Sequence, residues 1–109
     1  TSLFAGSPGQ GGIADGTGTA ARFSGTAVLT ANATHVFVAE EANRRIRRVD
    51  ASTALVETIA GTGSQGYIDN PTGLNAEFGS LEALATDGTT IWVADGANHV
   101  IRAVSTAAP

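Results

Sequence analysis

The chain repeats itself at an offset of 55 residues. Laid on itself at this offset without a gap, the 109-residue sequence shows 18 identities in 54 paired positions, and unmatched pairs such as Phe37 and Trp92 are similar in kind. Because one third identity without an insertion indicates duplication, we predict two copies of one structural unit. The matching segments include Ala5-Gly6 with Ala60-Gly61, Ala21-x-Phe23 with Ala76-x-Phe78, and Ile46-Arg47-x-Val49 with Ile101-Arg102-x-Val104.

Each copy contains short segments of strand length, rich in β-branched and aromatic residues and separated by Gly, Asn, Asp and Thr. The pair Asp87-Gly88 between two of them predicts a hairpin turn. No segment shows a clear 3.6-residue apolar period, so we predict an all-β fold. The expected strands are 27–31, 35–39, 45–49 and 55–60 in the first copy and 82–86, 90–94 and 100–104 in the second. The Gly-rich segments 6–23 and 61–78 are predicted to be loops, each fixed by a buried phenylalanine at its end.

Composition excludes several classes of protein. With 42% hydrophobic residues and a net charge of −4, the chain is predicted to be globular. It has no Cys, which excludes disulfides and thiol chemistry. No apolar run reaches the ~18–20 residues of a membrane span. All six basic residues are Arg and acids outnumber them, which argues against nucleic acid as the main partner. Since the chain starts at Thr1 and lacks Met, we expect an excised or processed piece.

Two segments, Val36 to Val49 and Ile91 to Val104, resemble the signature of NHL repeats, a hydrophobic-Tyr-Val-Ala-Asp run followed by a turn and Asn-His-Arg-Ile-Arg. The Gly-rich inserts from Phe4 to Phe23 and from Ile59 to Phe78 are similar to those between NHL repeats. The resemblance implies two four-stranded blades of a β-propeller, a fold that most often has six blades. The chain departs from the family at Thr26 and Leu81, and again at Val28 and Ala83, where the first strand often begins with Pro and Gly.

The phase of the repeat predicts self-assembly. Residues 55–60 are the fourth strand of the first copy, so by the same offset residues 1–5 are a fourth strand whose own blade is missing, while 82–104 lack one. We therefore expect residues 1–5 to complete a blade of a neighbouring subunit, with blade 1 at 6–60 and blade 2 at 61–109. Three chains would give a six-bladed ring, because such head-to-tail contacts close into rings or continue as filaments. The alternative is a fragment of one long propeller.

Two sets of apolar residues follow from this arrangement. The first set is expected at the interface between subunits, and the second in the core between sheets. The interface set is Leu3, Phe4, Ala5, Val100, Ile101 and Val104, and the core set is Phe23, Phe37, Val38, Ile46, Phe78, Trp92 and Val93, with Ile101 expected to contribute to both.

Motifs with chemical potential are weak. Gly61-x-Gly63-x-x-Gly66 has the spacing of a dinucleotide loop, but Pro71 and Gly73 preclude the helix such a site needs, so no cofactor is predicted. The loops beginning at Asp15 and Asp69 lack the alternating oxygen ligands of calcium loops, and their aspartates are expected to cap turns.

Polar residues beside the strands are also interpreted structurally. Glu40, Glu41 and Asp95 follow strands, but His35 and His99 occupy non-equivalent positions, so no metal site is predicted. The run Arg44 to Arg48 is flanked by acids and is expected to form cross-strand ion pairs on a solvated face. Asn32-Ala33-Thr34 matches a glycosylation sequon, which matters only in a eukaryotic secretory context.

We therefore predict a non-enzymatic propeller unit that assembles with itself, most simply as a trimer, with no catalytic, cofactor or metal residues. One alternative is a piece of an extracellular bacterial propeller that binds a protein or a glycan, where a glycan site would depend on Tyr67. Another is a piece of a metal-dependent propeller hydrolase or lyase.

Overall fold

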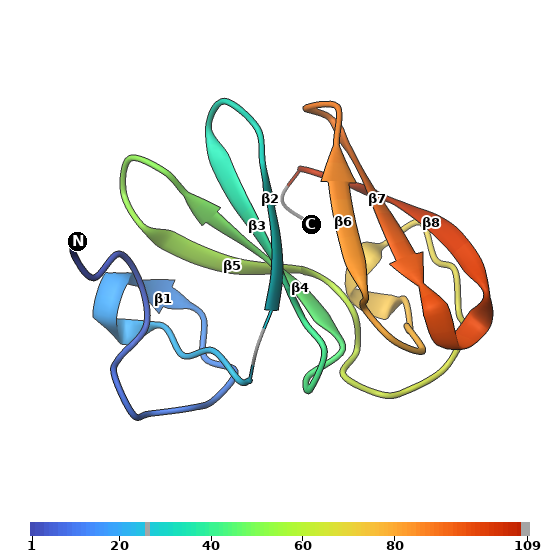
Figure 1. Cartoon of the computed structure of the whole chain (residues 1–109), viewed down its shortest axis with the longest axis horizontal. Coiled ribbons are helices and arrows are strands. Elements are labelled where there is room, and N and C mark those ends of the chain that lie inside the picture. Colours follow the sequence, from blue (N-terminus) through green and yellow to red (C-terminus); the bar gives the residue numbers. More distant parts are fainter. Residues whose placement is uncertain (26, 108–109) are drawn as a thin grey trace.

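A computed structural model describes residues 1–25 and 27–107 and contains two antiparallel β-sheets side by side (Figure 1). The first sheet has five strands in the order β1-β5-β4-β3-β2, and the second has three in the order β6-β7-β8. The strands are β1 (Gly16–Thr17), β2 (Ala27–Ala31), β3 (His35–Glu40), β4 (Arg45–Asp50), β5 (Leu55–Ala60), β6 (Ala83–Thr86), β7 (Thr90–Asp95) and β8 (Val100–Ser105). Single 3-10 turns form η1 (Gly18–Ala20), η2 (Gly73–Asn75) and η3 (Gly96–Asn98).

The all-β fold is as predicted, and the seven expected strands agree with the structure to within one residue at each end. Turn residues set the hairpins: the Asn32 side chain accepts the backbone N–H of Thr34 and of His35, and Asp87 does the same for Thr89 and Thr90. Thr26 and residues 108–109, which the predicted units include, lie outside the described residues. Among the described residues, no helix has the length and apolarity to cross a bilayer.

Two features differ from the sequence prediction. The first sheet gains a fifth strand, because β1 within the predicted loop 6–23 pairs with β5. Residues 1–5, expected to be a strand, form none in the single chain. A lone extended segment leaves its backbone groups unpaired, so it needs a strand beside it. Gly6 then donates to the carbonyl of Gly18, as its counterpart Gly61 donates to Gly73.

The main core lies between the two sheets. It combines residues from the inner face of the first sheet with residues from β7 and from the end of the loop 61–78: Phe37, Ala39, Ile46, Ile59, Ala60, Ala76, Phe78, Leu81, Ile91 and Val93. A smaller cluster of Ala21, Val38, Val49 and Val56 covers the other face of the first sheet, with Ala5, Phe23 and Val36 packed against it. The two inner strands β2 and β6 lie next to each other.

Trp92 was expected in the core, but it is 41% exposed. The counterpart position in the first sheet is Phe37, which is fully buried. The reason is placement: Phe37 faces the second sheet, whereas Trp92 faces away from the first sheet, on a side where no strand within residues 1–25 and 27–107 packs over it. Of the other expected core residues, Phe37, Val38, Ile46, Phe78 and Val93 are buried, and Phe23 is half-buried in the smaller cluster. Ile101, expected in both sets, is 70% exposed.

Candidate functional site

A buried arginine ties the first loop to the first sheet. Arg47 on β4 is fully buried, and its Nη1 donates to Glu40 Oε1 at 3.1 Å and to the carbonyl of Arg22. Its Nη2 and Nε donate to Asp15 Oδ1 at 3.0 and 3.2 Å, and Nη2 also reaches the carbonyl of Ala14. Because every guanidinium nitrogen has an acceptor, the buried charge is compensated. The guanidinium carbon lies 5.0 Å from the centre of the Phe23 ring.

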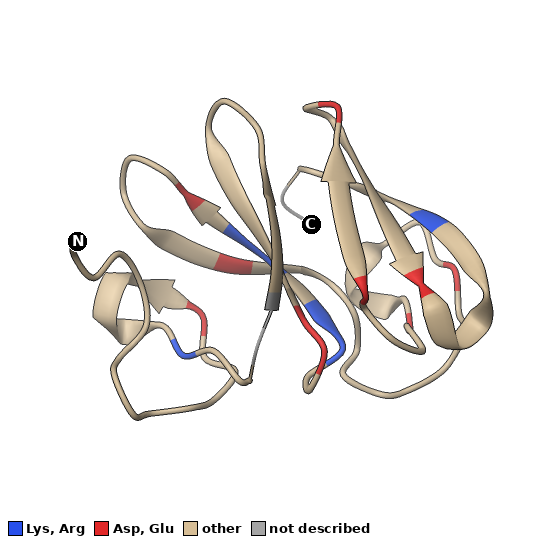
Figure 2. Ribbon diagram, viewed as in Figure 1, with Lys and Arg blue, Asp and Glu red and all other residues tan. Residues whose placement is uncertain are grey.

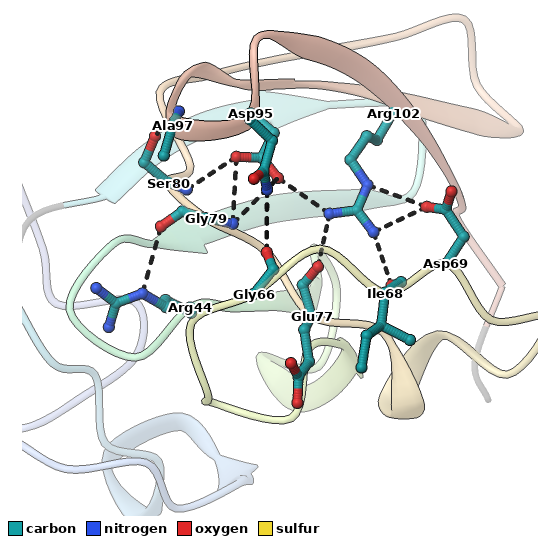
Figure 3. Close-up of polar contacts among 11 residues, drawn as sticks. Arg44, Gly66, Ile68, Asp69, Glu77, Gly79, Ser80, Asp95, Ala97 and Arg102 are labelled. Atoms are coloured by element: carbon teal, nitrogen blue, oxygen red, sulfur yellow. Dashed lines mark hydrogen bonds and ion pairs between the residues drawn. The ribbon is translucent and has the colours of Figure 1, made fainter.

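The second copy builds the same cluster around Arg102 on β8 (Figure 3). Nη1 donates to Asp95 Oδ2 at 3.0 Å and to the carbonyl of Glu77, while Nη2 and Nε donate to Asp69 Oδ1 at 2.8 and 3.1 Å. The guanidinium lies 4.7 Å from the ring centres of both Tyr67 and Phe78. The loops that precede β2 and β6 are therefore each held to their sheet by a buried arginine.

Asp95 is fully buried. Burial opposes its ionisation, but hydrogen bonds from the backbone N–H of Ser80 and Gly79, from Asn98 and from Arg102 outweigh that effect and lower the pKa of Asp95 to about 2. The carboxylate is therefore ionised at neutral pH, and both of its oxygens accept hydrogen bonds. It acts as a fixed acceptor for neighbouring donors.

These clusters correct three sequence expectations. Arg47 is not on a solvated face, although Arg48 does form the expected cross-strand pair, with Glu57 at 2.9 Å. Asp15 and Asp69 hold arginines and do not cap turns. The gapless offset of 55 pairs Asp15 with Asn70, whereas the structure equates Asp15 with Asp69 through a local offset of 54. Aligning Gly12-x-x-Asp15 with Gly66-x-x-Asp69 would have found this pair.

Charge is distributed unevenly between the copies: five of the six arginines lie in the first copy, whereas the second copy has Arg102 and five acids (Figure 2). Arg44 Nε donates to the carbonyl of Gly79 and Arg45 Nη2 to that of Thr62, so both connect the first copy to the second. His35 lies 3.8 Å from Asp50 across the β3–β4 pair. Over the described residues, no three His, Cys, Asp or Glu side chains gather as metal ligands.

Of the glycine motif, Gly61 and Gly63 adopt positive φ of 99° and 94°. The segment after Gly66 runs through isolated β-bridges and reaches a single 3-10 turn only at Gly73. It is therefore a loop lying on the sheet, without the helix N-terminus that would bind a pyrophosphate.

The second sheet is open along β8. Among the described strands, β8 pairs only with β7, whereas its counterpart β4 pairs with both β3 and β5. Beside β8 lies a hollow of about 860 Å³. Its lining includes Tyr67, Asp69, Pro71 and Phe78 of the loop 61–78, Ile59 and Ala60 at the end of β5, and Arg102 and Val104 of β8.

One face of the second sheet is also uncovered. Cross-strand pairing places Ala85 beside Trp92 and Ala103, and Ala83 beside Ala94 and Ile101. These six side chains are apolar, and the polar pair Thr90 and Ser105 lies at one end of the same face. The counterparts of Trp92, Ala94 and Ile101 in the first sheet are Phe37, Ala39 and Ile46, which are fully buried between the sheets. The outer face of the second sheet therefore carries, in an exposed setting, the same kinds of apolar residue that the first sheet buries in its contact with the second.

Known proteins share this fold. No sequence-family profile matches the chain. Two solved structures from Bacteroides thetaiotaomicron superimpose on 94% of it: one provisionally described as a phosphatase, with a TM-score of 0.75 and 25% identity, and one of unknown function, with a TM-score of 0.82 and 24% identity. A curated protein, Protein SUPPRESSOR OF QUENCHING 1, chloroplastic, from Arabidopsis thaliana, is 34% identical over 76 residues, which are 69% of this chain.

The chain is much shorter than these proteins. It spans 26% of each solved chain and 7% of the Arabidopsis protein. The comparisons therefore support an all-β arrangement of two antiparallel sheets that, in larger proteins, is one part of a longer chain.

Proposed function

We propose that this chain is a pair of NHL-type β-propeller blades that acts as a non-enzymatic scaffold by assembling with copies of itself into a closed ring. The observation that carries the proposal is the outer face around Trp92, which repeats the residues that bury the contact between the two sheets. An apolar face of this kind is unfavourable in water and marks an interaction surface.

The opposite end of the molecule offers a matching surface. In the internal contact, Phe37, Ala39 and Ile46 pack against Ala76, Phe78, Ile91 and Val93 of the second copy. At the offset of 55, those four residues correspond to Ala21, Phe23, Val36 and Val38 on the outer side of the first sheet, where Phe23 and Val36 are half-buried and Ala21 and Val38 are buried beneath them. Leu29, 62% exposed on that same face, corresponds to Leu84, which packs against the core. The outer face of the second sheet in one chain therefore matches the outer face of the first sheet in the next chain.

The buried carboxylates support a structural role. Glu40 and Asp95, the acids that follow β3 and β7, are fully buried and bound by Arg47 and Arg102, so they have no free lone pair directed at solvent for acid–base or metal chemistry. The description of one structural neighbour favours hydrolysis of phosphate esters as a second candidate function. Two measurements on the purified protein separate the two functions: metal analysis, and incubation with a chromogenic phosphate ester. Release of the chromophore would favour the enzyme.

Trp92 reports on assembly directly, because it is the single tryptophan of the chain. We expect its emission to shift to the blue as protein concentration rises, and native mass spectrometry to show about three times the 10.9 kDa of one chain. A folded monomer at all concentrations, with unshifted emission, would refute the scaffold. Trp92→Glu should prevent assembly, whereas Ile13→Glu should not, because Ile13 is 51% exposed and its counterpart Ile68 stays 44% exposed beside the internal contact.

A further inference from the structure

We propose that the hollow beside β8 binds residues 1–5 of a second copy as an added antiparallel strand, and that Asp69 accepts a hydrogen bond from the backbone N–H of its Leu3. This inference rests on the proposed function and specifies which partner segment fills the open edge.

The hollow lies where the first copy has a strand. In the first copy, β5 lies between β4 and β1. In the second copy, the counterpart of β4 is β8 and the counterpart of β1 is Pro71–Thr72. Both border the hollow of about 860 Å³. The second copy therefore has both walls of a strand site.

Asp15 shows what its counterpart Asp69 lacks. Asp15 Oδ2 accepts the backbone N–H of Thr58 on β5 at 3.1 Å, and Oδ1 accepts the Thr58 hydroxyl at 2.9 Å in addition to Arg47. Asp69 Oδ1 is held by Arg102 in the same way, but within residues 1–25 and 27–107 no donor reaches Oδ2, and the side chain is 70% exposed. A buried arginine therefore holds Oδ1, and Oδ2 remains available to a backbone donor of an added strand.

Residues 1–5 have the composition of the missing strand. The offset places Leu3 at the position of Thr58, Phe4 at that of Ile59 and Ala5 at that of Ala60. Ile59 and Ala60 are buried between the sheets, whereas Leu3 and Phe4 are 57% and 47% exposed. A strand added to an edge gains main-chain hydrogen bonds and side-chain pockets together.

The strand must come from another copy. The N-terminus lies at the end of the molecule beyond β1, while β8 lies at the opposite end (Figure 1). Gly6, which donates to Gly18, anchors the segment near its own loop 6–23. An exchange between chains in one direction is head-to-tail, which closes into a ring or extends as a filament.

A designed disulfide tests the pairing and its register. In the first copy Arg48 lies opposite Glu57, so the offset places Ala103 opposite Ser2 of the next copy. Directly opposite residues are close enough for a disulfide, whereas diagonal neighbours are about 7–8 Å apart. The chain has no cysteine of its own. Ser2→Cys/Ala103→Cys is compared with the off-register control Ser2→Cys/Ser105→Cys under mild oxidation on non-reducing gels.

We expect the first variant to form covalently linked chains ending at three, and the control to form at least tenfold fewer. Asp69→Ala should weaken the linkage about tenfold, as loss of one charged hydrogen bond implies, while Glu41→Ala, an exposed acid elsewhere, should leave it unchanged. Equal linkage in both double variants would overturn the register and the proposal.

The Trp92 emission separates this inference from the proposed function. A blue shift with concentration but no Ser2–Ala103 linkage would overturn strand addition while leaving assembly through the apolar faces intact. The absence of both the emission shift and the linkage would overturn both proposals. Linked species longer than three chains would support strand addition and overturn the three-chain ring.

Discussion

The first and second sheets contain the same sequence pattern in different surroundings. In the first sheet, Phe37 and Ile46 face the second sheet and are fully buried; in the second, Trp92 and Ile101 occupy the same positions and are 41% and 70% exposed. The strands that carry these residues have the same length in both sheets: β3, β4, β7 and β8 each have six residues. Burial in this chain is thus decided by whether another unit follows, and the residue type at a position does not decide it.

The two arginine clusters show the opposite behaviour. Arg47 and Arg102 keep the same set of partners, although β4 is an interior strand and β8 an open edge. Each cluster is completed by the loop that precedes its own sheet, so it needs no neighbouring unit. Each arginine cluster is therefore complete within its own copy, whereas the apolar faces pack only where two copies meet.

The largest expected effect comes from truncating the matched aromatics. Phe37→Ala should lower the free energy of unfolding by about 3 to 5 kcal/mol, as for large buried aromatics. Trp92→Ala should cost less, about 1 to 2 kcal/mol in dilute solution, because the side chain is 41% exposed. Urea unfolding followed by far-UV circular dichroism measures both. Equal losses would show that Trp92 is already covered under those conditions.

A similar loss is expected when the buried charge pair is broken. Arg47→Ala leaves Glu40 buried without its cation, which should cost about 3 to 5 kcal/mol. Arg102→Ala should cost less, because the open β8 edge lets water reach Asp95. Urea midpoints of the two variants give the comparison. The double variant Arg47→Met/Glu40→Leu should recover much of the loss, and failure to do so would mean that Arg47 acts mainly through the loop carbonyls.

The strands were predictable because their information is local. Alternating β-branched residues between Asn, Asp and Gly turns define each hairpin, and the repeat doubles the signal. β1 was missed because Gly16-Thr17 carries no strand preference and pairs only because the loop lies against β5. Tertiary placement created that strand.

The arginine clusters could not be predicted from local sequence in the way that the strands could. The sequence shows Arg47 within a run of charged residues, where a solvated face is the usual outcome. Its burial depends on Asp15, 32 residues away, and the matching Asp69 is displaced by one position from the repeat. The exposure of Trp92 depends on which segments pack over the outer face of the second sheet, and the strand pattern around Trp92 carries no information on that.

Two equivalent glycines sharpen the comparison of the loop entries. Gly6 and Gly61 have positive φ of 92° and 99°, so alanine at either should cost about 1 to 2 kcal/mol in backbone strain. A Cβ at Gly61 would also overlap the carbonyl oxygen of Arg44, whereas at Gly6 it would lie 3.2 Å from the flexible Phe23 ring. Thermal unfolding should therefore show the larger loss for Gly61→Ala. The reverse order would mean that the two loops enter their sheets differently.

The smallest expected effect is on acid stability. The pKa of Asp95 is lowered from an ordinary value of 3.8 to about 2 in the folded chain, so its ionised form contributes stability that is complete above pH ~4. That contribution is lost as the pH falls from about 4 toward 2, because the unfolded chain takes up the proton first. Asp95→Asn cannot titrate, so its stability, lower at neutral pH, should change less over this interval. Urea unfolding of both proteins at pH 2.5 to 5 gives the two slopes. Parallel slopes would place the acid sensitivity in the other carboxylates, such as Asp50, whose pKa is also lowered to about 2 by hydrogen bonds from Ser52 and Thr53.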